Sequence, residues 1–363
     1  MASYRDFLNK IEASDSTILK KAREHLDMLA KPPGSLGKLE EIAAKLCAIG
    51  RTLSPTIDKR CIIVLASDNG VVAEGVALAP QEITAIQTIN IAHGITGVGV
   101  LAKQFHTDLM VADIGVNADL HDSKIIDRKI RKSTGNIAVE PAMTQEEAEK
   151  AVDIGFELAC QAKEQGYQMI GVGEMGIGNT TTSSAVLSAL LKIDDASKVT
   201  GRGAGLDDAS YRKKVDVIKN SLLLHRPNPD NPIDIIKKVG GLDIAAMTGV
   251  YLGAAYCGLP VVIDGFISIV AALCATRLCP TVKDYLFASH HSFECGYALA
   301  MEALEMKACL NLDMRLGEGS GCPLMFAMMD AALAVFREMG TFNDAAIDDR
   351  YLDGIKEIGD KAF

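Results

Sequence analysis

Three glycine-rich segments contain the residue types that could carry chemistry. The first, residues 171–182, reads GVGEMGIGNTTT and includes the G-x-G-x-x-G spacing of dinucleotide-binding loops. We expect it to follow a strand and to open a helix over 183–191, so that glycine amides and the helix N-terminus can approach a phosphate. The acid that a dinucleotide fingerprint needs falls on Asp194-Asp195, with no strand before it. A mononucleotide phosphate therefore fits better, with Glu174 facing ribose hydroxyls; the alternative is a plain tight turn.

The second glycine-rich segment, residues 199–208, reads VTGRGAGLDD and precedes Lys213 and Lys214. Two glycine loops with a cation nearby can hold one phosphate from two sides, and lysine suits this role as a mobile point charge. The alternative is that both lysines lie on a solvated helix surface.

The third segment, residues 316–321, reads LGEGSG. A carboxylate among glycines has little side-chain cover, so Glu318 is a candidate general base if it lies in a dry pocket. The alternative is a flexible surface loop. A fourth stretch, Ser67-Asp68-Asn69-Gly70, follows an apolar run and would lie at the carboxyl end of a strand, where open α/β sheets bind ligands. The alternative is that the Asx residues only form the turn.

From Cys61 onward, short apolar runs alternate with amphipathic stretches. Helices are expected at 85–105 and at 144–165, the latter opened by a capping box from Thr144 to Glu147. This alternation predicts an α/β fold with a mostly parallel sheet and helices on both faces. The runs that we interpret as buried strands are 61–66, 108–116, 167–172, 259–265 and 285–289.

Both ends of the chain look helical. Residues 14–50 form a helical pattern broken at the KPPGSLG sequence of 31–37, where two prolines end one helix and Ser35 can help to start the next. A further helix is expected at 324–338. We predict a small helical domain of residues 1–45 with 325–363, beside an α/β catalytic domain of 46–324.

The composition excludes several classes of protein. Lys and Arg number 37 against 47 Asp and Glu, a net charge of −10, so a nucleic-acid partner is not expected. The charged N-terminus lacks a secretion signal, and the uncharged run 245–263 fits a buried helix and strand better than a membrane span. Nine scattered cysteines without a C-x-x-C, and seven histidines without a ligand cluster, predict reduced core thiols in the cytoplasm and no metal.

Six motifs occur together and in order: KPPGSLGKLE, GVALAPQEIT, GEMGIGNTTTS, VTGRGAGLDD, SHHSFECG and LGEGSG. Through them the chain resembles, along nearly its full length, the nicotinate-nucleotide–dimethylbenzimidazole phosphoribosyltransferases of cobamide lower-ligand synthesis. The resemblance implies a Rossmann-like α/β domain with a small helical domain built from both chain ends, in a dimer, with no cofactor. It also implies transfer of phosphoribose from nicotinate mononucleotide to an aromatic base, which releases nicotinate and gives an α-ribotide.

The resemblance also assigns residues. The family's catalytic base falls on Glu318 and its ribose-facing glutamate on Glu174, which could also offset positive charge developing on the sugar. An acceptor-pocket glutamine falls on Gln87, and Leu316 belongs to the same pocket. The phosphate and ribose contacts fall on Gly176, Asn179, Thr180, Gly203, Lys214 and Ser292.

Two departures leave the acceptor open. Many members of the family have Asp-His-Gly where this chain has Asp68-Asn69-Gly70, and a serine that binds the second benzimidazole nitrogen matches Ala79. A related branch uses phenol or p-cresol and works as a heterodimer of two paralogues, and the chain is compatible with its catalytic subunit. Two other interpretations are an NAD-dependent oxidoreductase, which rests on the glycine fingerprint alone, and a non-catalytic subunit that supports an active paralogue.

Overall fold

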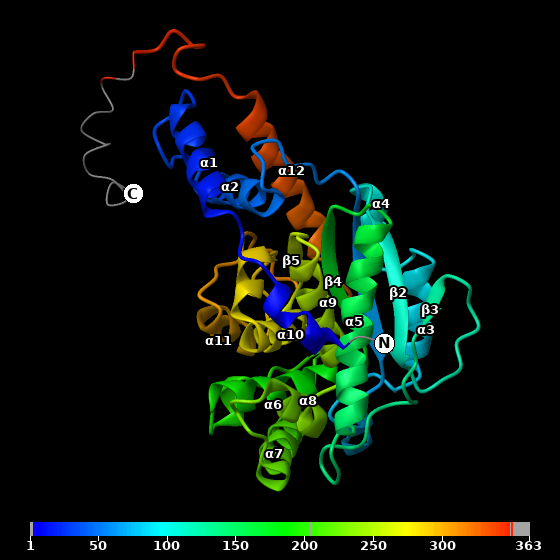
Figure 1. Ribbon diagram of the computed structural model, residues 1–363. Helices are drawn as coiled ribbons and strands as arrows, with labels where there is room; N and C mark the ends of the chain where they lie inside the picture. The colour runs from blue at the N-terminus through cyan, green and yellow to red at the C-terminus, as the bar shows by residue number, and fades with distance from the viewer. Residues whose placement is uncertain (1–2, 204, 349, 351–363) are drawn as a thin grey trace. The chain divides into compact units, whose positions relative to one another are not determined.

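The structure is a computed structural model that describes residues 3–203, 205–348 and 350. The chain, drawn in Figure 1, divides into two compact units. The larger unit comprises Met1–Glu12 and Asp58–Met325, and the smaller comprises Ala13–Ile57 and Phe326–Phe363.

Within the described residues, the larger unit is built on a six-stranded sheet of order β3-β2-β1-β4-β5-β6. Every neighbouring pair of strands is parallel, which confirms the predicted α/β fold class. All the expected strands are present, and β3 was not expected. The strands are β1 (Arg60–Ser67), β2 (Asp108–Gly115), β3 (Ile125–Asp127), β4 (Met169–Met175), β5 (Val261–Ile263) and β6 (Leu286–Ala288).

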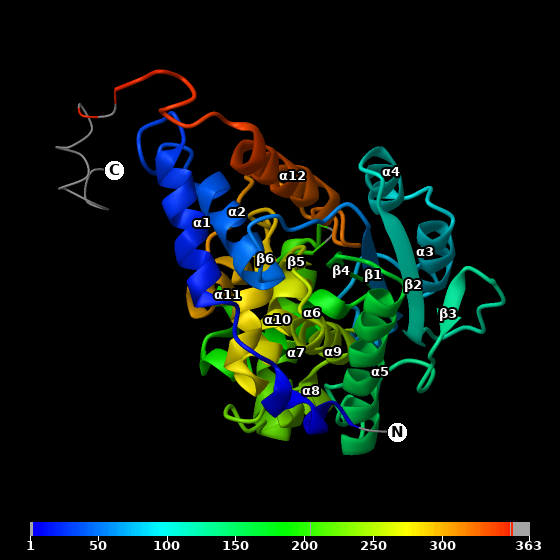
Figure 2. The ribbon, with the colours of Figure 1, turned by 45° about the horizontal axis from the view of Figure 1, so that its top comes forward.

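Helices connect the strands, and α3 and α5 lie on opposite faces of the sheet (Figure 2). The predicted capping box is present at the start of α5, where Thr144 and Glu147 satisfy each other's backbone N–H groups. The α-helices are α3 (Ile83–Ala92), α4 (Gly97–Gln104), α5 (Gln145–Glu164), α6 (Asn179–Leu191), α7 (Asp208–His225), α8 (Pro232–Val239), α9 (Leu242–Tyr256), α10 (Phe266–Leu278) and α11 (Gly296–Ala303). The 3-10 helices are η1 (Tyr4–Asp6), η2 (Leu8–Lys10), η3 (Gly70–Glu74), η4 (Ala196–Lys198) and η5 (Pro280–Tyr285).

One expected helix is divided. The pattern over 85–105 predicted a single helix, but the chain turns between α3 and α4, where Gly94 has a φ of +72° that other residues rarely adopt. By length and composition alone, the stretch Ile83–Gln104 could cross a bilayer. The run 245–263 forms the buried helix α9 and the buried strand β5, as predicted.

The smaller unit contains α1 (Ser16–Met28), α2 (Lys38–Gly50) and most of α12 (Cys322–Glu338). Its bounds differ from the predicted ones, because residues 1–12 belong to the larger unit, where Tyr4 N donates to Asp153 Oδ1 at 2.6 Å and Phe7 stacks on Phe156. The other predicted boundary, at residue 45, falls inside α2. Ser35 does not cap that helix; Gly37 does, with a φ of +52°.

The strand order creates a switch point between β1 and β4. From β1 the chain moves outward to β2 and β3, and from β4 it moves the other way to β5 and β6. Loops that leave adjacent strands in opposite directions open a crevice at the carboxyl ends of those strands, where α/β sheets bind ligands. Strands β1 and β4 to β6 are buried along nearly their whole length, which fixes the positions of the loops that follow them.

Candidate active site

A cavity of about 410 Å³ lies at the carboxyl ends of β4, β5 and β6. Its volume is in the range of small-molecule sites. Segments far apart in the sequence supply its walls, among them the loop before α3, the start of α6 and the loop before α12. All the site residues expected from the sequence line it: Ala79, Gln87, Glu174, Gly176, Asn179, Thr180, Gly203, Lys214, Ser292, Leu316 and Glu318.

The glycine fingerprint is not a loop. Gly171, Gly173 and Glu174 lie within β4, and only Gly176–Gly178 form the turn into α6. A Cβ on Gly173 would lie 2.4 Å from the carbonyl oxygen of Glu318. The first two glycines therefore allow the loop before α12 to pack against β4, and they do not approach a pyrophosphate. This corrects the expected placement of Glu174 in a loop and removes the structural basis of the dinucleotide interpretation.

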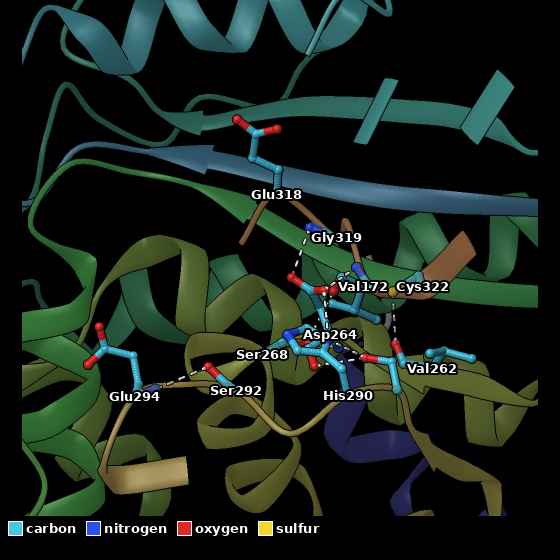
Figure 3. Close-up of polar contacts among 12 residues, drawn as sticks. Val172, Val262, Asp264, Ser268, His290, Ser292, Glu294, Glu318, Gly319 and Cys322 are labelled. Carbon is cyan, nitrogen blue, oxygen red and sulfur yellow. Dashed lines mark hydrogen bonds and ion pairs between the residues drawn. The ribbon is translucent and has the colours of Figure 1, made fainter. Parts of the chain in front are cut away.

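The loop that holds Glu318 has an unusual backbone. Gly317, Glu318 and Gly319 have φ values of +85°, +64° and +89°, so a non-glycine residue adopts the left-handed conformation between two glycines. Such a backbone persists only where its surroundings hold it. Asp264, which follows β5, supplies this support: its Oδ2 accepts from Gly319 N at 3.1 Å and its Oδ1 from Gly321 N at 2.7 Å (Figure 3).

The Glu318 side chain points away from Asp264 (Figure 3). One of its two carboxylate oxygens has a hydrogen-bond partner. Gln87 Nε2 donates to Oε1 at 2.6 Å, and Asn90 Nδ2 donates to Gln87 Oε1 at 3.3 Å, which fixes the orientation of the amide. Oε2 is buried and has no hydrogen-bond partner within the described part of the chain. Glu318 thus presents one acceptor oxygen to a ligand.

Glu174 is a buried acid between other acids. Its Oε2 accepts a short hydrogen bond from Asn179 Nδ2, and its Oε1 accepts from the backbone N–H of Glu318 at 3.4 Å. Burial, with the nearby carboxyls of Asp243 and Asp264, raises the pKa of Glu174 to about 8. In the free protein at pH 7 this carboxyl is therefore mostly protonated and neutral, as a buried acid without a cation should be.

Lys214 is fully buried on α7, whereas Lys213 is exposed. Lys214 Nζ donates to Thr180 Oγ1 at 2.8 Å, and a Cβ on Gly203 would lie 3.7 Å from it. Burial lowers the pKa of Lys214 to about 8, which Glu294 partly opposes. The interpretation of both lysines as solvated surface is therefore wrong for Lys214. A buried ammonium beside a glycine loop and the N-terminus of α6 is suited to bind an anion.

The segment after β6 completes this part of the wall. The buried Ser292 Oγ accepts from Glu294 N at 3.5 Å (Figure 3). Burial, with His291 nearby, lowers the pKa of His290 to about 4, so its ring is neutral at pH 7. Among the described residues, no group of three or more His, Cys, Asp or Glu side chains is arranged to hold a metal.

The lining of the cavity also includes apolar side chains. Ala79, Leu316 and Ile83 line it beside Gln87 and Glu318. The Asx residues of 67–70 lie behind the cavity wall: Asp68 Oδ2 accepts from Asn117 N at 2.8 Å, and Asn69 Oδ1 accepts from Thr182 Oγ1 at 3.3 Å. They hold the loop after β1 in place.

Sequence reasoning missed Asp264 and Asp243, two buried acids whose charges help to raise the pKa of Glu174. Asp264 ends the predicted strand 259–265, so the rule that singled out Asp68 applied equally to it. Asp243 lies in an apolar stretch at the start of α9, where it accepts from Ile244 N at 2.9 Å and carried no signal.

Comparisons with known proteins show the family to which the chain belongs. Residues 11–347 match a family model described as "Phosphoribosyltransferase". A nicotinate-nucleotide–dimethylbenzimidazole phosphoribosyltransferase of Clostridium perfringens is 53% identical over 352 residues, 97% of each chain, and one of Ruminiclostridium cellulolyticum is 47% identical over 346 residues, 95% of this chain and 98% of the relative. The crystal structure of the enzyme so named from Thermus thermophilus superposes with a TM-score of 0.87 at 37% identity, over 92% of this chain and 99% of that one.

A doubly wound parallel sheet with buried acids and a lysine at its switch point defines a ligand-binding enzyme of the α/β class. The chain belongs to the family of the nicotinate-nucleotide–dimethylbenzimidazole phosphoribosyltransferases. It is accordingly a phosphoribosyltransferase, and the glycine fingerprint that suggested an NAD-dependent oxidoreductase lies largely within β4.

Proposed function

We propose that the protein transfers the phosphoribosyl group of nicotinate mononucleotide to an aromatic base, in the synthesis of a cobamide lower ligand. The acceptor atom attacks the anomeric carbon of the ribose, the bond from that carbon to the pyridinium nitrogen breaks, and nicotinate leaves with the electron pair. The acceptor loses one proton, and the product is an α-ribotide. The names of the relatives support this reaction, and so do two pairs of residues in the cavity, Lys214 with Thr180 and Glu174 with Glu318.

The donor's phosphate binds at Lys214, Thr180 and Gly203, with Gly176 and Ser292 beside them. Lys214 supplies the charge, and the N-terminus of α6 adds its partial positive charge. Asn179, next to Thr180, fixes Glu174 near the ribose. When the donor binds, its positively charged pyridinium ring lowers the pKa of Glu174, and the carboxyl releases its proton to solvent. The carboxylate then stabilises the positive charge that develops on the sugar in the transition state, because a carboxylate in a dry site interacts strongly with a nearby cation.

The observation that carries the proposal is the free, buried Oε2 of Glu318. Gln87 occupies Oε1, so Oε2 is the oxygen that takes the acceptor's proton. Leu316 lies close to this oxygen, since a Cβ on Gly97 would meet both, and Ala79 lines the same cavity; these apolar groups fit an aromatic ring. General-base catalysis needs the base within hydrogen-bond reach of the proton, and a ring bound next to Leu316 would meet Oε2 first.

The acceptor is 5,6-dimethylbenzimidazole or a phenolic base such as phenol or p-cresol. Ala79 presents a methyl group to the ring, and leaving a ring nitrogen unpaired there costs about 1–3 kcal/mol, whereas an apolar ring edge loses nothing. This observation favours phenolic acceptors as additional substrates.

We also propose a cytoplasmic dimer, with a second copy or with a paralogous subunit. Ile86, Ile95 and Val100, on and between α3 and α4, are more than half exposed, and such a group of apolar side chains is typical of a protein interface. Light scattering of the pure chain, alone and with Ile95→Lys, distinguishes a dimer from a monomer.

One assay tests the function: purified protein with nicotinate mononucleotide and a panel of azoles and phenols, with the ribotides separated by chromatography. We expect nicotinate release that depends on the acceptor. No ribotide with the chain alone, and ribotide after a paralogue is added even when this chain carries Glu318→Gln, would instead support the non-catalytic role.

A further inference from the structure

Two cysteines on neighbouring helices lie close enough to react with each other. Cys160, near the end of α5, and Cys257, which caps α9, have Sγ atoms 3.4 Å apart. Both side chains are partly exposed, and neither lines the cavity. We propose that they form a reversible intramolecular disulfide, a modification site that fastens α5 to α9.

The packing of the two helices creates this contact. A Cβ on Gly249 would lie 1.9 Å from the carbonyl oxygen of Val152, and one on Gly253 would lie 2.6 Å from that of Phe156. The glycines therefore let the two backbones touch. Cys160 lies four residues after Phe156, and Cys257 lies four residues after Gly253. The cysteine pair therefore continues the series of contacts along the two helices, and the helix packing brings the two positions together.

The geometry suits a disulfide. Bonded sulfurs are about 2.04 Å apart, so the two Sγ atoms must approach by roughly 1.4 Å. Cys257 lies at the end of its helix, and Gly258 follows with a φ of +66°. A thiol at a helix end next to a glycine can make this movement by rotation about its Cα–Cβ bond and a small backbone adjustment.

The surroundings favour Cys257 as the attacking thiol. The hydrogen bond shared by the two thiols lowers the pKa of Cys257, and Lys163 lowers it further against the opposing effects of burial and Glu164. The same hydrogen bond raises the pKa of Cys160, as do burial, Glu164 and Glu157. Because the thiolate is the nucleophile, Cys257 reacts first and Cys160 resolves the intermediate.

The reaction is thiol–disulfide exchange with a small disulfide, for which glutathione disulfide is the probe. The Cys257 thiolate attacks one sulfur of the probe, its S–S bond breaks, and one glutathione thiolate leaves. Cys160 then loses its proton and attacks Sγ of Cys257, which expels the second glutathione. In total two protein thiols are oxidised, one disulfide is reduced to two thiols, and a dithiol reductant reverses the change.

The test uses the full chain in glutathione buffers of graded ratio, followed by acid quenching, alkylation and peptide mass mapping. We expect a linked pair of peptides carrying Cys160 and Cys257, lighter by two hydrogen atoms, that disappears with dithiothreitol. Thermal unfolding of the oxidised protein should move to higher temperature, because the cross-link closes a long loop of the unfolded chain. Cys257→Ser abolishes the link and leaves at most a glutathione adduct on Cys160.

The matched control is Cys295→Ser, which removes an exposed thiol at the start of α11 and should keep the link. The proposal is overturned if both cysteines stay reduced, or carry only glutathione, in buffers that modify Cys295. A link without any change in unfolding temperature would overturn the claim that it fastens the helices. Should Cys257→Ser not fold, the peptide map of the unsubstituted protein decides by itself.

Discussion

The backbone N–H of Glu318 donates to Oε1 of Glu174 at 3.4 Å, although the two residues are 144 positions apart. The proposed base and the proposed ribose-facing acid therefore form one assembly, in which the side chain of one supports the backbone of the other. Residues that share a contact are not independent, so their substitutions should not act additively.

Glu318→Gln should lower the rate of transfer about 10²- to 10⁴-fold, the usual cost of losing a general base. The amide keeps the size of the side chain and can still contact Gln87, so the fold should be unchanged by circular dichroism. Glu146→Gln, on the exposed first turn of α5, is the matched control and should leave the rate unaltered. Near-normal turnover of Glu318→Gln with every acceptor would remove this residue from the proposed role.

Glu174→Gln should make stability less dependent on pH. The pKa of Glu174 is raised from 4.5 to about 8, so the folded protein keeps a proton that the unfolded chain releases. The free energy of unfolding that this group contributes is therefore fully present below about pH 4.5 and is lost as the pH rises through 8, with a slope of at most about 1.4 kcal/mol per pH unit. Urea unfolding at pH 5, 6, 7 and 8 measures the slope; identical slopes for variant and parent would contradict the prediction.

Lys214→Ala should weaken nicotinate mononucleotide far more than nicotinate riboside, which lacks the phosphate. A charge-assisted contact contributes about 1.5–3 kcal/mol, roughly ten- to a hundredfold in affinity. Lys213→Ala is the matched control, because its side chain is exposed on the same helix and should change little. Equal losses for nucleotide and riboside, measured by calorimetry, would mean that Lys214 supports structure.

Asp264→Ala should lower kcat with little change in the KM for nicotinate mononucleotide. The substitution removes both oxygens that accept from Gly319 N and Gly321 N, so the loop of Glu318 loses its left-handed geometry. The contact between Lys214 and Thr180 does not involve Asp264 and should stay intact. Asp264→Asn keeps one acceptor oxygen and should retain more activity than Asp264→Ala. A rise in KM with kcat unchanged would show that Asp264 acts on donor binding instead.

Ala79→Ser should shift the product ratio toward benzimidazoles. The added hydroxyl can pair with the second ring nitrogen, which a methyl cannot do, and that pairing is worth about 1–3 kcal/mol. Competition between dimethylbenzimidazole and p-cresol in one tube measures the ratio. If no phenolic ribotide forms with the parent protein, with or without a paralogous partner chain, the argument from Ala79 is wrong.

The sequence predicted the sheet well where strands are long and buried. Runs such as 61–66 contain only apolar residues, and β1 occupies Arg60–Ser67. Strand β3 was missed because three residues, one of them Asp127, leave no recognisable pattern. Glu174 was placed in a loop because four glycines between 171 and 178 suggest a turn, whereas two of them serve close packing of another segment against the strand.

The sequence predicted the residues of the candidate site that face the cavity. It missed the residues that act by positioning other residues. Glu318 and Lys214 have side chains whose chemistry is visible in a sequence. Asp264 acts by holding two backbone N–H groups 55 and 57 residues further along the chain, a relationship that only the folded chain reveals.

The division of the sheet at its switch point has a consequence for how such enzymes can diversify. Ala79 and Gln87 belong to the crossover between β1 and β2, while Glu174, Thr180 and Lys214 belong to the half that starts with β4. In the proposed roles, part of the acceptor pocket is thus encoded by a different stretch of the gene from the donor site, although Leu316 and Glu318 of that pocket follow β6. A replacement confined to residues 76–92 could exchange one aromatic base for another and leave the sugar chemistry as it was.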